Sequence, residues 1–395
     1  MQIRKFAGAA AVVVMACILP SHTEAQGIAR RVSAVRDGKV RLTFAARPDI
    51  CGFGDGISTR SSERTNFRSN WNSRPNEDVA YDNECSEGPV RAVFTIDNGQ
   101  ITRIRAYVGG RWRSASGVTD LGAVPAREAV EYLLSVANTQ SGKAAGEAIF
   151  ATTLADSVQV ALPLFSIAKN ESRPREVRDQ AVFWLSQLDD ERAVGMLEDI
   201  LKTARDNDIR DKAIFGLSQH RSGKGFPILR AYAENNSAPD GLREKAIFWL
   251  GQQRAPEGGQ YLRSLYSRLG SEALQEKVIF SVSQQKDEQS AKWLVDLAGN
   301  QSESIELRKK ALFWAGQTGE SLDRLVSMYD RMKEREMREQ MIFVFSQRKE
   351  RAALDKLIDI AKNDPDREMR RKAMFWLGQS KDPRVAAFLT DIISR

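Results

Sequence analysis

The dominant pattern along the chain is a block in which apolar residues recur at helical spacing and a Phe is followed four positions later by a Gln. The block returns about every 32 residues over more than half of the chain, which is typical of stacked helical units rather than of one closed core. We therefore predict a helical solenoid over residues 143–395. The blocks lie at Phe183/Gln187, Phe215/Gln219, Phe248/Gln252, Phe280/Gln284, Phe313/Gln317, Phe343/Gln347 and Phe375/Gln379.

On a helical wheel, each block separates a packing face from a mixed face. In the third copy, Ala246 and Leu250 fall on one side, whereas Phe248 and Gln252 fall on the other beside a Lys and a Glu. Because burying amide and charged groups without partners is costly, the Phe/Gln side is a poor core. The sequence therefore proposes this side as a candidate surface.

The block resembles HEAT-type repeats, in the shorter bacterial HEAT-like form. The matching string is Val-Arg-x-x-Ala-x-x-x-Leu-(Gly/Ser), found at residues 177–186 and similarly at 242–251 and 369–378. The resemblance implies an all-α superhelical solenoid of HEAT-like helix pairs, whose second helices line the concave side. Where such repeats usually carry a small residue, this chain carries Trp184, Trp249, Trp314 and Trp376.

These Trp residues occur in every second copy, and the copies between them carry Gly216, Ser281 and Val344 at the same place. Since packed interiors tolerate neither voids nor overlap, we expect each Trp to fill space left by its smaller neighbours, with two repeats as the packing unit. A Gly216→Trp substitution should then destabilise the fold by about 1–3 kcal/mol.

We call the seven Phe/Gln pairs the Phe/Gln ladder. Two hypotheses explain it, and both can hold together. As a concave binding surface, it would offer apolar contact, paired amide groups and a positive rim to an extended peptide, as armadillo-type solenoids do by analogy. If the ladder is structural, each Phe would pack between two second helices, and each Gln would form a hydrogen bond to the next repeat. The rim would consist of Lys212, Lys245, Lys277, Lys310 and Lys372.

An Arg row opens the repeated helices, at Arg178, Arg210, Arg243, Arg308, Arg338 and Arg370, with Gln275 in the fourth copy. We favour Arg side chains that hold turn carbonyls or carboxylates over an anion-binding row, given their place on the packing side.

Residues 26–118 predict a small β-rich domain. Alternating runs on both sides of Asn98-Gly99 predict a hairpin, and residues 40–44 form a further strand. Cys51 and Cys85 are expected to form a disulfide that closes a long loop over residues 52–83. Two Cys and one His after the leader make a zinc site implausible, so no metal or cofactor is expected.

A connecting helix is expected within residues 119–142, opened by Pro125. The segment around Phe150 reads as a degenerate first repeat, followed by seven clear ones. An amphipathic helix over residues 385–393 would cap the end of the stack.

Residues 1–25 predict a secretory signal: a charged start, an apolar stretch of about 14 residues that is too short to span a membrane, and a cleavage site after Ala25. The alternative is a lipoprotein anchored through Cys17. Either way, export to the periplasm or beyond the cell is expected.

Composition gives little support for catalysis or nucleic-acid binding. The net charge is +7, but 59 basic residues are mixed with 52 acidic ones, which fits a solvated surface. His220 is expected to be a solvated turn residue, and no phosphate-binding loop or nucleophile elbow is present.

We therefore expect an exported, non-catalytic scaffold that binds a protein or peptide. The alternative is a glycan-binding envelope protein, and a carboxylate-only hydrolase comes third.

Overall fold

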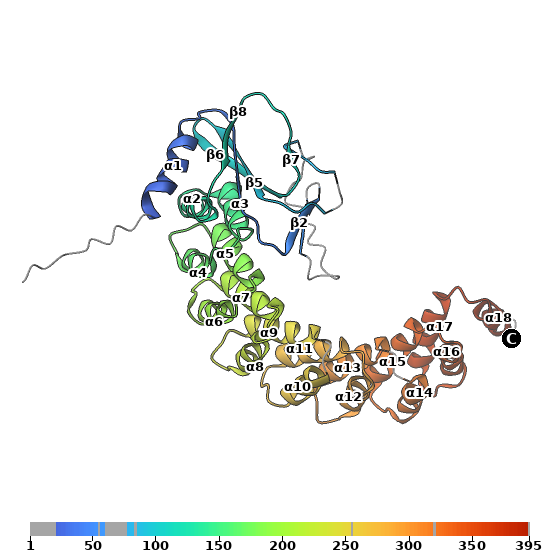
Figure 1. Cartoon of the computed structure of the whole chain (residues 1–395). Coiled ribbons are helices and arrows are strands. Elements are labelled where there is room, and N and C mark those ends of the chain that lie inside the picture. Colours follow the sequence, from blue (N-terminus) through green and yellow to red (C-terminus); the bar gives the residue numbers. More distant parts are fainter. Residues whose placement is uncertain are drawn as a thin grey trace, which may run out of the picture. The chain divides into compact units, whose positions relative to one another are not determined.

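The structure is a computed structural model that describes residues 21–53, 56–59, 77–82, 85–253, 256–318 and 321–393 (Figure 1). Most of the expected leader, including Cys17 and the apolar stretch, lies outside these residues. The chain divides into two compact units, residues 1–188 and 189–395. The first holds a small sheet region and helices, and the second is helical.

A four-stranded sheet in the order β6-β5-β1-β8 forms the centre of the first unit. Its strands are β1 (Gly38–Phe44), β5 (Val90–Asp97), β6 (Gln100–Val108) and β8 (Val118–Ala123). The pair β5/β6 is the expected antiparallel hairpin, and Asn98 and Gly99 adopt the positive φ values of 52° and 75° that a tight hairpin turn needs. The hairpin prediction is confirmed. β8 pairs in parallel with β1, so strand structure continues past the expected boundary at residue 118.

One face of this sheet is buried, and the other is covered only in part. On one face, Phe94 packs on Tyr132 of α2 (Ala126–Thr139), with ring centroids 5.6 Å apart. On the other face, Val93, Tyr107 and Val79 form a cluster. The short pair β4 (Val79–Ala80) and β7 (Arg111–Trp112) contributes to that second cluster.

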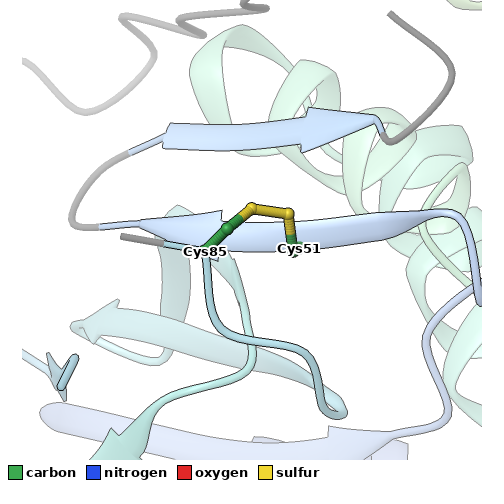
Figure 2. The surroundings of a disulfide bond; sticks show 2 residues. All are labelled: Cys51 and Cys85. Atoms are coloured by element: carbon green, nitrogen blue, oxygen red, sulfur yellow. A yellow bond between two sulfur atoms is a disulfide. The ribbon is translucent and has the colours of Figure 1, made fainter. Parts of the chain in front are cut away.

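A second hairpin carries the disulfide. β2 (Ile50–Phe53) pairs with β3 (Gly56–Thr59), and Cys51 of β2 is bonded to Cys85, with Cα atoms 5.3 Å apart (Figure 2). The disulfide prediction is confirmed. The expected loop over residues 52–83 is wrong where β2, β3 and residues 79–80 form strands; residues 54–55, 60–76 and 83 lie outside the described chain.

The helices of the first unit are α1 (Ser21–Ser33), α2, α3 (Gly142–Thr152), α4 (Ala161–Lys169) and α5 (Arg175–Gln187), of which α3 lies against β6. α2 begins directly after Pro125, as expected. Glu147 of α3 is 6% exposed and accepts the backbone N–H of Ile104 at 2.7 Å and a guanidinium N–H of Arg103 at 3.1 Å. A carboxylate from α3 thus accepts a backbone N–H at the edge strand β6. Burial raises the pKa of Glu147, and the hydrogen bonds from Ile104 and Arg103 partly offset this rise.

The second unit consists of helices in pairs. The first helices of the pairs are α6 (Arg192–Thr203), α8 (Gly225–Glu234), α10 (Pro256–Tyr266), α12 (Glu288–Gly299), α14 (Leu322–Arg331) and α16 (Arg351–Asn363). The second helices are α7 (Asn207–Gln219), α9 (Asp240–Gln252), α11 (Glu272–Ser283), α13 (Ile305–Gln317), α15 (Arg335–Gln347) and α17 (Arg367–Gly378). Each second helix contacts the next second helix, so these helices form a layer of their own.

The core between the first helices and the second helices contains the Ala and Leu residues expected on the packing face. Ala246 and Ala311 are fully buried, and Leu250 is 2% exposed. Close approach between second helices depends on glycine: a β-carbon at Gly251 would lie 2.5 Å from that of Ser281. Likewise, a β-carbon at Gly316 would lie 2.5 Å from a methyl group of Val344. The small residues of the intervening copies therefore fit against the glycines of the preceding copies, whereas we expected them to leave room for Trp.

The Arg row is structural, as favoured. Arg243 and Arg308 are 5% and 4% exposed, and their Nε atoms donate to the carbonyls of Ala233 and Ala298 at 3.0 and 3.1 Å. Arg178 makes the equivalent bond within the first unit. Each Arg thus closes the end of the helix that precedes its own, where carbonyl groups lack helical partners.

The final helix, α18 (Pro383–Ile393), packs on α16. Val385 and Phe388 are 2% and 6% exposed, Lys362 of α16 lies 5.1 Å from the Phe388 ring, and Arg384 pairs with Asp355 at 2.9 Å. These contacts join α18 to α16, and its role as the cap of the stack stays a prediction.

Candidate binding surface on the second helices

A continuous row of aromatic rings crosses the second helices of the second unit. Each ring contacts the next with centroids between 5.0 and 6.3 Å apart, and the row passes from α7 to α17. We call it the aromatic row; in order, its rings are Phe215, Trp249, Phe248, Phe280, Trp314, Phe313, Phe343, Trp376 and Phe375.

Two kinds of contact alternate along the aromatic row. Each Trp meets the Phe of its own helix and the Phe of the preceding second helix, as Trp314 does with Phe313 and Phe280. Between these groups, Phe248 stacks on Phe280 with planes 6° apart, and Phe313 stacks on Phe343 with planes 12° apart. The period of two repeats is therefore visible in the ring geometry.

The aromatic row is partly exposed, in contrast to the Ala/Leu core. Its Phe and Trp side chains are half-buried, and Phe375 at its end is 58% exposed. In the first unit, a shorter row joins Phe150, Trp184 and Phe183 at 4.7 and 5.0 Å. Phe150 thus meets Trp184 of the next second helix as Phe215 meets Trp249, and the degenerate first repeat stays a prediction.

The Gln residues stand beside the aromatic row and differ in how they are held. Gln219 donates from Nε2 to Ser218 Oγ at 3.1 Å, and that hydroxyl donates to the carbonyl of Phe215 at 2.7 Å. The same relay recurs at Gln187/Ser186, Gln284/Ser283 and Gln347/Ser346. These four amides bond within their own helix, so the expected bond across to the next repeat is wrong for them.

In the other copies, Gly replaces the tethering Ser. Gln252, Gln317 and Gln379 follow Gly251, Gly316 and Gly378, and these three Gln side chains are exposed. Within the second unit, tethered and untethered amides therefore alternate from one second helix to the next.

The expected positive rim is not what the lysines form. Lys310 Nζ lies 2.6 Å from Glu276 of the preceding second helix, and Lys372 lies 3.2 Å from Glu339. Lys245 and Lys277 pair in the same way with Asp211 at 3.6 Å and Glu244 at 3.7 Å; Lys212 is exposed. These cross-helix pairs balance positive with negative charge along the border of the aromatic row.

A hollow of about 400 Å³ adjoins the last part of the aromatic row. Gln347, Trp376 and Gln379 line it together with Arg348 and Arg384 from the neighbouring turns. Both guanidinium groups are already bound, Arg348 to Glu350 and Arg384 to Asp382 at 2.9 Å. Lys349 also lines the hollow, so the ladder side chains reach open space that is bordered by charged groups of both signs.

Buried acidic side chains outside this surface are satisfied by cations. Asp364 is 7% exposed; it accepts hydrogen bonds from Arg338 and, at 2.7 Å, from the Tyr329 hydroxyl. Burial, followed by the hydrogen bond to Asp364, raises the pKa of Tyr329. Such a paired carboxylate fits a structural contact.

His220 is not the solvated turn residue that we expected. It ends α7, is only 4% exposed, and its Nδ1 lies 2.9 Å from Ser222 Oγ. The ring closes the turn between α7 and α8. Within the described parts of the chain, His, Cys, Asp and Glu form no group of three that could hold a metal ion.

The surface contains residues that the sequence interpretation assigned elsewhere or missed. Trp249, Trp314 and Trp376 were placed in the core, but they are half-buried rings of the aromatic row, whereas Trp184 is 5% exposed, as expected of a core residue. The acidic partners of the lysines were not recognised, although Asp211, Glu244, Glu276 and Glu339 all lie four residues before a ladder Phe. That regular spacing is the signal that could have found them.

No helix in the described segments is long and apolar enough to cross a membrane.

Comparison with known proteins assigns the chain to no family. No protein-family model matches the chain, and no curated protein matches it. Human deoxyhypusine hydroxylase is 16% identical, with 58% of this chain and 88% of that chain covered and a TM-score of 0.29. The CpcE–CpcF phycocyanin lyase complex of Nostoc sp. is 15% identical, with 60% and 96% covered and a TM-score of 0.31. A lipovitellin structure is 12% identical, with 78% and 40% covered and a TM-score of 0.47.

Proposed function

We propose that this chain is an exported, non-catalytic scaffold with HEAT-like repeats, and that it binds an extended protein segment on the face of its second helices. The observation that carries this proposal is the aromatic row, which stays partly exposed over α7 to α17 with an amide beside each Phe. A row needed only for packing would be covered, because exposed aromatic area forgoes the stabilisation that burial gives.

The chemistry of this face suits a peptide. Rings offer apolar contact, and an amide both donates and accepts, which matches the repeated N–H and C=O groups of a main chain. Because the flanking lysines are paired with carboxylates, a strongly anionic partner gains little here. Export is proposed from the leader-like residues 1–25 together with the disulfide.

The test is a binding screen of the purified chain from residue 26 against a peptide array and a polysaccharide panel. We expect peptides to be retained, and retention to fall in a Gln252→Ala/Gln317→Ala variant whose melting temperature is unchanged. The matched control is Gln289→Ala, because Gln289 is an exposed Gln on α12, which is the first helix of its pair and lies outside the proposed binding face. Retention of polysaccharides alone would favour the glycan-binding alternative, and retention of neither would contradict the proposal.

A further inference from the structure

Neighbouring second helices meet through contacts that recur along the second unit. Where a helix with Trp precedes one without, as α9 precedes α11 and α13 precedes α15, the two ladder Phe rings stack within 12° of parallel. The residue after the later Phe, Ser281 or Val344, packs closely on the glycine of the earlier helix. The earlier helix thus offers a ring and a glycine, and the later helix offers a ring and a small side chain.

A third contact joins the ends of these helices. Gln285 Nε2 donates to the carbonyl of Gly251 at 2.6 Å, and a guanidinium N–H of Arg348 donates to the carbonyl of Gly316 at 3.0 Å. Both donors lie five residues after the Phe of the later helix. Because the last carbonyls of a helix have no intrahelical partner, the later helix also satisfies the end of the earlier one.

α17 carries the earlier half of this interface without the later half. Its residues 375–379 repeat residues 248–252 of α9 as Phe-Trp-Leu-Gly-Gln. Gly251 and Gly316 are buried, whereas Gly378 is exposed and nothing lies within 4 Å of a β-carbon added to it. Phe375 is 58% exposed. The next helix, α18, contacts α16, so this side of α17 is open in the described part of the chain.

Charge is matched across the same interfaces. In four of them, a carboxylate four residues before the earlier Phe pairs with a Lys three residues before the later Phe, as Glu244 does with Lys277. α13 instead carries Lys309 at the first of these positions, and α15 carries the uncharged Gln340 at the second. A basic residue on the earlier helix is thus not opposed by a Lys on the later one.

α17 has a basic residue at this position, namely Arg371. Its side chain is 76% exposed and pairs with Glu368 of the same helix at 2.6 Å. Arg371 lies one helical turn before Phe375, on the same side of α17. A helix that completes the interface would therefore meet a positive charge where α11 meets Glu244, so an acidic side chain suits it better than Lys.

We propose that the open side of α17 docks an α-helix of a partner protein, parallel to α17 and placed as α11 is placed against α9. The partner helix carries a Phe, a small residue directly after it, an acidic residue three positions before it, and a Gln or Arg five positions after it. This interaction goes beyond the proposed peptide binding, because it uses the side of the last second helix rather than the face that all second helices share.

The probe is a peptide that copies residues 271–287, which include α11 and Gln285, and a second peptide with Lys277→Glu. Both are cross-linked as helices on the side away from Phe280, since isolated helices of this length are marginal. Fluorescence anisotropy of the labelled peptides reports binding to the chain from residue 26. We expect Lys277→Glu to raise the affinity about fivefold, because it replaces a like-charge contact with Arg371 by an attractive one. Arg371→Glu in the chain should reverse this preference.

Gly378→Ala in the chain tests the close approach. Its β-carbon meets no atom of the chain itself, but it would occupy the space that the Ser281 side chain of the peptide needs. We expect at least about fivefold weaker peptide binding at an unchanged melting temperature. Gly195→Ala is the matched control, because Gly195 is an exposed glycine of α6 that likewise has nothing within 4 Å of an added β-carbon.

The outcomes keep this inference apart from the proposed peptide binding. Failure of both α11 peptides to bind would overturn it, and so would binding that ignores both the charge exchange and Gly378→Ala. Self-association of the chain that Gly378→Ala abolishes would replace the partner protein by a second copy. None of these results changes the retention of extended peptides, which depends on Gln252 and Gln317.

Discussion

The ring of Phe248 stacks on the ring of Phe280, with centroids 6.1 Å apart and planes 6° from parallel. These residues lie on neighbouring second helices, α9 and α11, and each also touches a Trp at its other side. A parallel stack of this separation is a favourable aromatic geometry, worth roughly 0.5–1.5 kcal/mol beyond area burial. The aromatic row therefore contributes to helix packing while leaving ring edges or faces at the surface.

Gly251→Ala should destabilise the second unit. The new β-carbon would lie 2.5 Å from the Ser281 β-carbon and 2.9 Å from its α-carbon, so the helices α9 and α11 must separate. Overpacking of this kind costs about 1–3 kcal/mol, against a gain of at most about 1 kcal/mol in helix propensity. Urea unfolding followed by circular dichroism measures the difference.

Gly378→Ala is the matched control for that substitution. Gly378 occupies the same place after its Phe, but nothing lies within 4 Å of a β-carbon added there. We expect no loss of stability. Equal destabilisation at Gly251 and Gly378 would show that close helix approach is not the reason for glycine at this position.

The pair Lys310–Glu276 should contribute little to stability. Its side chains are 47% and 49% exposed, and exposed pairs typically contribute about 0.2–1 kcal/mol despite the 2.6 Å separation. A double-mutant cycle with Lys310→Ala and Glu276→Ala, measured at low and high salt, gives the coupling. A coupling that exceeds this range and persists at high salt would contradict the assignment of a screened surface pair.

Removing the disulfide should weaken the first unit. Cys51 and Cys85 are 34 residues apart, and closing a loop of that length contributes about 3–4 kcal/mol in the chain-entropy account. We expect Cys51→Ser/Cys85→Ser to lower the unfolding free energy by about this amount. Dithiothreitol should destabilise the native chain but not the serine variant, and a native chain indifferent to reductant would contradict the prediction.

Truncation after Gln379 should destabilise the end of the second unit. It removes the buried side chains of Val385 and Phe388, each worth about 1.5–3 kcal/mol when fully covered, and exposes the apolar side of α16. A lower melting temperature and concentration-dependent aggregation are expected. An unchanged melting temperature would exclude a capping role for α18.

Asp382 should remain ionised to unusually low pH. The side-chain hydrogen bond from Arg384 and then the Arg384 backbone N–H lower the pKa of Asp382 from 3.8 to about 2. Because its folded-state pKa is depressed, its contribution to stability is present above pH 3.8 and is lost as the pH falls towards 2. Carbon-detected NMR titration measures this pKa, and Arg384→Gln should raise it; an unshifted value in the native chain would contradict the contact.

Local sequence pattern was sufficient for the elements whose determinants are close in the chain. Asn98-Gly99 between two alternating runs specified the β5/β6 hairpin, because positive φ values are available there at low cost. The Ala/Leu stripe likewise specified the buried side of each repeated helix, since a 3.6-residue period assigns faces without knowledge of the neighbours. The two cysteines indicated their own bond once an exported chain was expected.

The tertiary structure decided what those faces meet. The alternation of large and small residues placed Trp249 in the core, yet it joins the aromatic row because Phe215 of the preceding second helix lies beside it. Lys310 reads as a free cation, yet Glu276, which is 34 residues earlier, neutralises it. His220 reads as a solvated turn, yet the packing around α7 buries it. Contacts of this kind depend on how closely helices from different repeats approach each other. The repeat period in the sequence therefore predicted a row of stacked helices, whereas only their packing decided which side chains pair, which are buried and which stay exposed.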